Sequence, residues 1–170
     1  MSYRSDYSHD DVVEDVLSAV PDSHRDLLTA RSTAVLTTLD RRGRPQSTAV
    51  WYLLDRDGRL ICSVTADRQK YRNLRANPHC DLFLLDLANP FRALEIRAVA
   101  ELVPDPDKQT VAAFAQAHAV DQAMLAAAGE DRHTVVLRPW RIVASPPPAP
   151  QPAGAPHRSG LTGTAMTRTR

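Results

Sequence analysis

Six short stretches between residues 33 and 144 have the apolar, β-branched and aromatic character of β-strands. They are residues 33–40, 46–55, 59–65, 79–86, 93–103 and 134–144. The sequences RRGRP at 41–45 and DRDG at 55–58 supply the glycine and proline residues of tight turns. Pro139 falls inside the last stretch and predicts an edge, a bulge or a bend there, because proline has no backbone N–H. Mostly antiparallel strands with few helices favour a small β-barrel over a doubly wound sheet.

Three other stretches have helical character. Residues 9–30 place their apolar positions on one side, and Pro21 interrupts that pattern. Residues 104–128 are rich in alanine and predict one or two helices that end at Gly129. Residues 66–78 predict a short helix with Asp67 as its N-cap, and this helix ends before Pro78.

Length and composition indicate one folded domain with an extension at each end. A chain of 170 residues is long enough for a single hydrophobic core. Residues 1–24 predict an N-terminal helical extension, and residues 25–144 hold the strands. Residues 145–170 contain six of the thirteen prolines, no acidic residue and little that could be buried, which predicts a disordered tail. Because this tail has three arginines and the whole chain carries a net charge of only +1, residues 1–144 are slightly acidic.

Several functional classes are disfavoured by composition. A slightly acidic body argues against a general nucleic-acid binder, which usually carries a basic excess. The acidic N-terminus is no secretory signal and no stretch is apolar enough to span a bilayer, so we expect a cytoplasmic protein with no membrane partner. Cys62 and Cys80 form no CxxC motif and the six histidines have no paired spacing. We therefore expect two buried thiols, no disulfide framework and no metal site.

The sequence ADRQKYRNLRANP at 66–78 contains four cations and one acid. Arg68 and Lys70 fall in the first turn of the predicted helix, where the helix dipole disfavours each positive charge by about 0.3–1 kcal/mol. A phosphate would compensate, because exposed backbone N–H groups and both cations converge on it. Ser63 and Thr65 alternate onto one face of the preceding strand and could add hydroxyl donors. The alternative is a solvated helix face that carries all four cations, Arg68, Lys70, Arg72 and Arg75.

Three segments carry a resemblance to a known family. LTTLDRRGRPQSTAVWY, LICSVTADRQKYRNLRANP and NPFRALEIRAVAELV resemble the flavin and deazaflavin oxidoreductases of the pyridoxamine-phosphate-oxidase-like superfamily, and most of all its actinobacterial branch that uses coenzyme F420. The resemblance covers residues 25–144 and is most specific from Gly43 to Pro78. It implies a mainly β fold with flanking helices, the FMN-binding split β-barrel, as a homodimer with the cofactor in a groove at the subunit interface.

The resemblance also implies cofactor-binding residues. Ser63, Arg68 and Lys70 would hold the cofactor phosphate, with Asn73 close by, and Gln46, Thr48 and Val50 would line the flavin-type ring. No catalytic side chain is nominated, because a flavin-type cofactor itself carries out the hydride transfer. Tyr52 could serve as a proton donor and Trp51 as a stacking wall, but aromatic residues on a barrel strand belong to the core by default, so both are interpreted as core residues.

Three functions remain open at this point. The first is a reductase that passes a hydride from reduced coenzyme F420 to an unsaturated or quinone-like small molecule. The second is an FMN-dependent oxidase or reductase on the same barrel; vitamin B6 oxidation is the weaker form of it, because RPWRIVASPPP stands where true pyridoxamine phosphate oxidases carry an arginine-and-histidine motif. The third is a non-enzymatic cofactor binder or a weak nucleic-acid binder.

Overall fold

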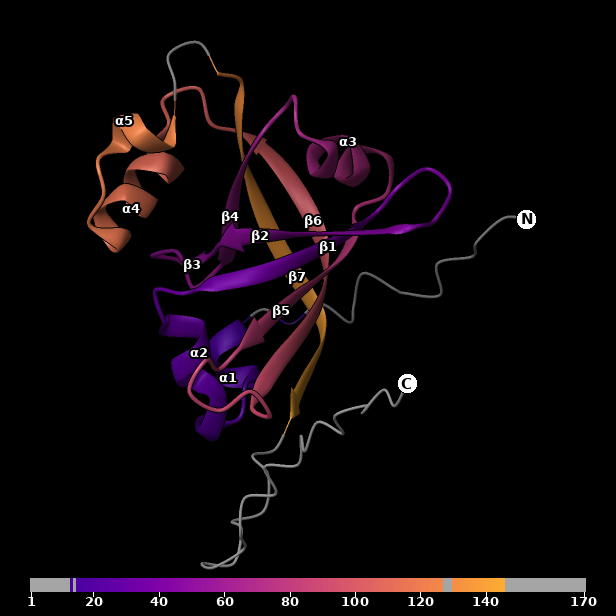
Figure 1. Cartoon of the computed structure of the whole chain (residues 1–170), viewed down its shortest axis with the longest axis vertical. Helices are drawn as coiled ribbons and strands as arrows, with labels where there is room; N and C mark the ends of the chain where they lie inside the picture. Colours follow the sequence, from indigo (N-terminus) through magenta and orange to yellow (C-terminus); the bar gives the residue numbers. More distant parts are fainter. Residues whose placement is uncertain (1–12, 14, 127–129, 146–170) are drawn as a thin grey trace, which may run out of the picture.

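Seven antiparallel strands form one sheet that curls into an open half-barrel (Figure 1). The computed structural model describes residues 13, 15–126 and 130–145. The strands are β1 (Thr33–Leu39), β2 (Pro45–Trp51), β3 (Leu53–Leu54), β4 (Leu60–Thr65), β5 (His79–Leu85), β6 (Ala93–Pro104) and β7 (Arg132–Ser145). Their order in the sheet is β2-β1-β5-β6-β7-β4-β3. The mainly β, barrel-like fold expected from the sequence is confirmed.

The stretch 46–55 is two strands, so the expectation of a single strand is wrong. β2 pairs with β1, whereas Leu53 and Leu54 pair with β4 at the other edge of the sheet. Tyr52 lies between the two strands, and its side chain is buried, with the hydroxyl donating to the backbone oxygen of Leu27. The chain thus crosses from one edge of the sheet to the other around a buried tyrosine. The interpretation of Tyr52 as a core residue is confirmed.

The long strands β6 and β7 bend the sheet into its curl. They pair from Ala93 opposite Ser145 to Pro104 opposite His133, with a register shift between Arg97 and Ala98. That shift lies opposite the Pro139 segment of β7, so the irregularity predicted from this proline is a β-bulge. The first half of β7 also pairs with β4. β7 therefore joins the two parts of the curled sheet.

The inner face of the half-barrel forms the core. Its fully buried side chains come from β1, β4, β5, β6 and β7 and include Leu36, Leu60, Leu82, Leu94, Ile96 and Leu137. Each such side chain contributes about 1.5–3 kcal/mol of burial free energy. Cys62 and Cys80 are free and buried among them, as the sequence predicts, and burial raises the pKa of the Cys62 thiol to about 12.

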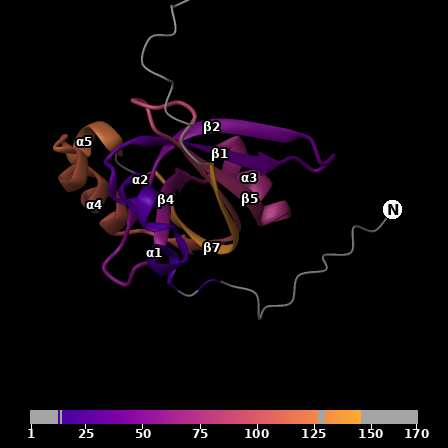
Figure 2. The same ribbon diagram turned by 90° about the horizontal axis from the view of Figure 1, so that it is seen from below.

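Short helices cover the barrel at three places. α4 (Gln109–His118) and α5 (Gln122–Leu125) lie together on one flank, and α3 (Gln69–Ala76) lies on the opposite flank (Figure 1, Figure 2). α1 (Val16–Ala19), the 3-10 turn η2 (Asp22–His24) and α2 (Arg25–Thr29) lie at one end of the sheet. Pro21 separates α1 from η2 and α2, so the helical pattern is interrupted at this proline, as the sequence predicts. Gly129 and residues 146–170 of the predicted tail lie outside the described residues, whereas Ser145, the first residue assigned to that tail, is the last residue of β7.

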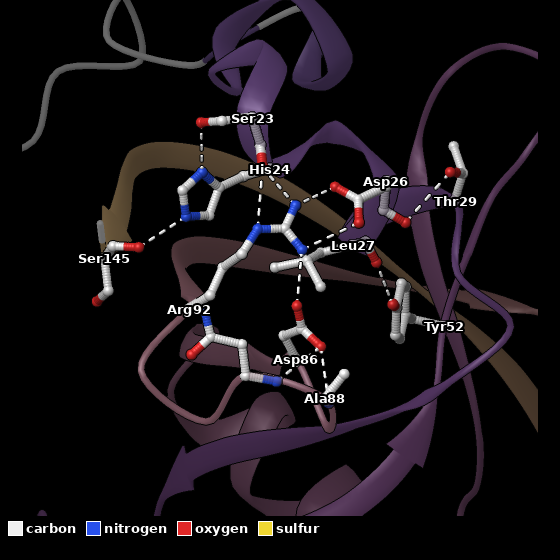
Figure 3. A network of polar contacts seen from close by, with 11 residues as sticks. Ser23, His24, Asp26, Leu27, Thr29, Tyr52, Asp86, Ala88, Arg92 and Ser145 are labelled. Atoms are coloured by element: carbon white, nitrogen blue, oxygen red, sulfur yellow. Dashed lines mark hydrogen bonds and ion pairs between the residues drawn. The ribbon is translucent and has the colours of Figure 1, made fainter. Parts of the chain in front are cut away.

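Arg92 ties the N-terminal helices to the hairpin between β5 and β6 (Figure 3). Its guanidinium donates to the backbone oxygen of Ser23 at 3.0 Å from Nε and to Asp86 at 2.9 Å, and it also contacts the carboxylate of Asp26. Only 14% of the Arg92 side chain is exposed. The partial burial of this charge among two carboxylates fixes the position of α2 on the barrel.

His24 makes the second tie between the N-terminal segment and the sheet (Figure 3). This buried ring contacts the Ser23 hydroxyl through Nδ1 at 2.8 Å and the backbone oxygen of Ser145 through Nε2 at 2.7 Å. The start of the described chain is thereby bonded to the end of β7.

Candidate functional site

A cavity of about 520 Å³ lies where β2 faces β4 beside the start of α3. Its lining residues are Gln46, Thr48 and Ala49 from β2, Ser63, Val64 and Thr65 from β4, Arg68, Gln69 and Lys70 at the start of α3, and Arg132 from β7. The volume falls within the range of about 300–1,000 Å³ that is typical of small-molecule sites. β2 is one edge strand of the sheet and β4 is next to the other edge, so the cavity occupies the opening of the half-barrel.

A smaller chamber of about 200 Å³ adjoins this cavity. The two share Ala49, Ser63, Lys70 and Arg132, and the smaller one continues to Val50, Trp51, Val111, Phe114 and Leu125. The larger cavity is polar and cationic on most sides, whereas the smaller chamber is apolar toward α4 and α5. The larger cavity can therefore accept a charged ligand, and the smaller chamber an uncharged planar one beside it.

Three cations line the larger cavity and no carboxylate does. Arg132 is bonded to Glu130 at 2.8 Å, but the Lys70 side chain has no hydrogen bond or ion pair with any described residue. Burial lowers the pKa of Lys70, and the nearby charges of Arg68 and Arg132 lower it further. A bound anion would relieve both effects, because it would neutralise an ammonium that the protein leaves uncompensated.

The N-terminus of α3 adds backbone donors to this cationic wall. The helix begins at Gln69, two residues after the predicted N-cap, and Arg68 takes the cap position without a side-chain capping bond. Asp67 was expected to cap the helix, but its carboxylate instead accepts from the hydroxyl of Thr65. With no acidic residue in the first turn, the N–H groups there stay available to an anionic ligand.

The hydroxyl groups predicted near the phosphate differ in their availability. Ser63 lines both cavities, and its oxygen accepts from Arg132 Nη1 at 3.4 Å. Thr65 also lines the larger cavity, but its hydroxyl is bonded to Asp67. Thr48 Oγ1 is buried and has no hydrogen-bond partner among the described residues. A buried hydroxyl without a partner is costly, so a ligand that bonds to Thr48 would recover free energy.

The structure brings six of the seven predicted site residues to the two cavities: Gln46, Thr48, Val50, Ser63, Arg68 and Lys70. Asn73 lines neither cavity and is only 2% exposed. It lies behind the lining, where its side chain bonds to Thr38 and Gln46. The roles of all seven in cofactor binding stay predictions.

Sequence reasoning missed Arg132 and the apolar chamber wall. Arg132 reaches the site because β7 pairs with β4, which sets it opposite Thr65. Trp51 was interpreted as a core residue, but it lines the chamber and stacks on His118 with ring centroids 3.9 Å apart. Burial lowers the pKa of His118, and the charge of Arg31 adds to this effect, which favours the neutral ring. No local sequence pattern predicts the contact between Trp51 and His118, because β2 and α4 are more than 50 residues apart.

Two kinds of feature are absent from the described residues. No group of three or more histidine, cysteine, aspartate or glutamate side chains in these ranges could hold a metal ion. None of the helices seen here is both long and apolar enough to cross a membrane.

Residues 20–143 match the sequence profile of the pyridoxamine 5'-phosphate oxidase family. The chain belongs to this family. The resemblance found in the sequence is therefore confirmed at the level of the superfamily, and the curled antiparallel sheet with its cavity is the family's split barrel. No curated protein sequence matches the chain at a significant level.

Solved structures of similar fold come from members with different names. A structure named F420 reductase is 33% identical, with a TM-score of 0.67, and the match covers 73% of this chain and 98% of that one. The conserved hypothetical protein Rv2991 of Mycobacterium tuberculosis is 23% identical, with a TM-score of 0.62 and coverage of 82% and 89%. HutZ of Vibrio cholerae, named a haem storage protein, is 20% identical, with a TM-score of 0.60 and coverage of 72% and 92%. The last two likenesses concern the fold alone.

Proposed function

We propose that this protein is an oxidoreductase that binds coenzyme F420 and transfers a hydride between the reduced coenzyme and an unsaturated or quinone-like small molecule. The observation that carries the proposal is the cavity at the opening of the barrel, with three cations, an uncapped helix N-terminus and no lining carboxylate. The 33% identity to a structure named F420 reductase supports F420 as the cofactor. FMN is the alternative, because it has the same kind of ring, ribityl chain and phosphate.

The donor set of the larger cavity fits such a cofactor. Lys70, Arg68 and the first-turn N–H groups of α3 would hold the phosphate, and Ser63 would add a hydroxyl donor. The partnerless hydroxyl of Thr48 and the side chain of Gln46 would bond to polar atoms of the ring. The bound deazaflavin ring supplies the hydride chemistry. The protein's own part is to bind and orient the ring and to keep water away from it.

The smaller chamber is suited to the second substrate. Val50, Val111, Phe114 and Leu125 give it apolar walls, and Trp51 adds an aromatic side chain that is fixed by its stack on His118. An uncharged, planar substrate would bury apolar surface there next to the ring. Lys70 lies at the junction of the two cavities, where it can hold an electronegative substrate atom or the cofactor phosphate.

We also propose that the protein is a homodimer, as the family resemblance implies. Val35 and Phe83 are cross-strand partners on the outer face of the sheet, and they are 40% and 36% exposed. A second copy packed on this face would remove both from water. Light scattering at micromolar concentration should give twice the mass of 18.8 kDa, and a monomer mass would contradict this part of the proposal.

Titration of the purified protein with coenzyme F420 and with FMN tests the cofactor. We expect saturable fluorescence changes with both and tighter, more salt-sensitive binding of F420, because its oligoglutamate tail adds negative charges that Arg72 and Arg75 could meet. Tighter binding of FMN would favour the FMN-dependent alternative. Failure of both cofactors to bind, at low and at high salt, would refute the proposed function.

A further inference from the structure

A series of hydrogen bonds connects four polar side chains from the outer side of α3 to the larger cavity. Arg72 donates to Gln69 Oε1 from Nη2 at 3.0 Å, and Gln69 donates from Nε2 to Asn73 Oδ1 at 2.7 Å. Asn73 then donates from Nδ2 to Gln46 Oε1 at 3.1 Å. Gln69 and Gln46 line the cavity, whereas Asn73 is buried between α3 and β2.

The direction of these hydrogen bonds is fixed by Arg72. A guanidinium can only donate, so the amide of Gln69 must present its oxygen to Arg72 and its nitrogen to Asn73. Asn73 must then accept through Oδ1 and donate through Nδ2. Thr38, which is fully buried, takes the second Nδ2 proton at 3.0 Å. Each side-chain amide in this series therefore has one orientation in which its hydrogen bonds to the neighbouring side chains form.

The last amide of the chain is the one that meets the ligand. The oxygen of Gln46 accepts from Asn73 at 3.1 Å, and the Thr38 hydroxyl lies 3.4 Å from the same oxygen. The side-chain nitrogen Nε2 of Gln46 makes no hydrogen bond with any residue in the described part of the chain. Since the two ends of an amide point in different directions, an oxygen held toward the protein interior leaves the NH2 group for the cavity.

We propose that Asn73 is a positioning residue that holds Gln46 with its amide nitrogen toward the cavity, so that the cavity selects a hydrogen-bond acceptor on its ligand. This inference rests on the proposed function, under which the acceptor is a carbonyl oxygen or ring nitrogen of the deazaflavin or flavin ring. Asn73 itself contacts no ligand. It determines that the Gln46 amide presents its nitrogen, and not its oxygen, to the ligand.

Asn73→Asp reverses this polarity while keeping the shape of the side chain. The new carboxylate can accept from Gln69, from the Thr38 hydroxyl and from the nitrogen of Gln46, so each buried group keeps a partner once the Gln46 amide turns over. The cavity then presents an oxygen where it presented a donor. Gln46→Glu makes the same change directly. We expect both variants to bind FMN and F420 about tenfold to a hundredfold more weakly, because two acceptors now face each other.

Thr38→Val is the matched control. It removes the other partner of Asn73 Nδ2 and should lower the melting temperature, but it leaves the oxygen of Gln46 bonded to Asn73. Its cofactor affinity should stay within about threefold of the parent. A donor at the ring also stabilises the electron-rich reduced form, so the reduction potential of bound FMN should fall in Asn73→Asp and stay unchanged in Thr38→Val. Equal potentials in the two variants would overturn the proposal.

Nuclear magnetic resonance of the cofactor-free protein tests the orientation without any ligand. In the parent, the side-chain amide protons of Asn73 should exchange slowly with water and those of Gln46 quickly. In Asn73→Asp, the amide protons of Gln46 should become protected. Fast exchange of the Asn73 amide protons in the parent would refute the hydrogen bonds from Asn73 to Gln46 and Thr38, and with them the proposed orientation of Gln46. Absence of cofactor binding in the parent, together with the expected exchange pattern, would instead refute the proposed function alone.

Discussion

Replacement of Lys70 by methionine is the most direct test of the cationic cavity. Methionine retains the length of the unbranched side chain and removes the charge. Because burial and two neighbouring arginines lower the pKa of Lys70, its ammonium is less favourable in the folded protein than in the unfolded chain. Below both pKa values, the charged group therefore opposes folding. The melting temperature of cofactor-free Lys70→Met should consequently equal or exceed that of the parent.

The loss of affinity should be large and should differ between the two cations. A hydrogen bond from Lys70 to a phosphate is charge-assisted and contributes about 1.5–3 kcal/mol, which corresponds to a weakening of about tenfold to 150-fold. The Arg68 side chain is 68% exposed, so water and salt screen its charge. Arg68→Met should weaken binding less than Lys70→Met does. Arg56→Gln, which removes an exposed charge from the turn between β3 and β4, serves as the control and should change binding little.

Fluorescence titration at low and high salt measures these affinities, and differential scanning fluorimetry measures the stability of the same samples. We expect the cofactor affinity to decrease from the parent to Arg68→Met and further to Lys70→Met. The melting temperature of Lys70→Met should not fall below that of the parent. If Lys70→Met binds as tightly as Arg56→Gln does, the cations of α3 form only a solvated helix face. If Lys70→Met unfolds at a lower temperature, the account of its burial is wrong.

Three further outcomes are expected. Arg92→Met should lower the free energy of unfolding by about 2–4 kcal/mol, because it removes the hydrogen bonds to the backbone of Ser23 and leaves the partly buried carboxylate of Asp86 without its cation. Limited proteolysis should then cut the N-terminal helices faster than in the parent. Burial and the charge of Glu95 raise the pKa of Asp81 from 3.8 to about 6. The protonated carboxyl therefore contributes to the stability of the folded protein fully below pH 3.8, and this contribution is lost as the pH rises through 6. Asp81→Asn should consequently melt at a higher temperature than the parent at pH 7.5 but not at pH 4. Removal of residues 146–170 should leave the melting temperature and cofactor affinity unchanged, and a clear drop in either would show that this segment packs on the domain.

Local patterns in the sequence predicted most strands and the helix α3, because both depend on residues close together in the chain. The glycine-and-proline turn at 41–45 and the arginine-rich stretch at 66–78 are of this kind. The start of α3 was misplaced for a local reason as well. The hydroxyl of Thr65 competes for the carboxylate of Asp67, and composition alone does not show which bond forms.

Features that depend on distant pairing could not be predicted in this way. Arg132 enters the cavity only through the pairing of β7 with β4. At Tyr52 the chain passes from one edge of the sheet to the other, and the Tyr52 hydroxyl donates to the backbone oxygen of Leu27. No pattern in the strand itself reveals this distant contact. Asn73 was assigned to the neighbourhood of the phosphate through the family resemblance, whereas its buried position behind the lining follows from the packing of α3 on β1 and β2.

The position of β7 in the sheet has a consequence for synthesis of the protein. In the described sheet, β4 and β3 are joined to the other strands through β7, which is the last strand to leave the ribosome. A nascent chain can pair β2, β1, β5 and β6 while β4 still waits for its neighbour, and during that interval β4 is an open edge that other chains can join. Both walls of the cavity exist early, but they face each other only after the C-terminal strand arrives. A ligand of this cavity would therefore bind only after β7 has paired, so its binding would report that the sheet is complete.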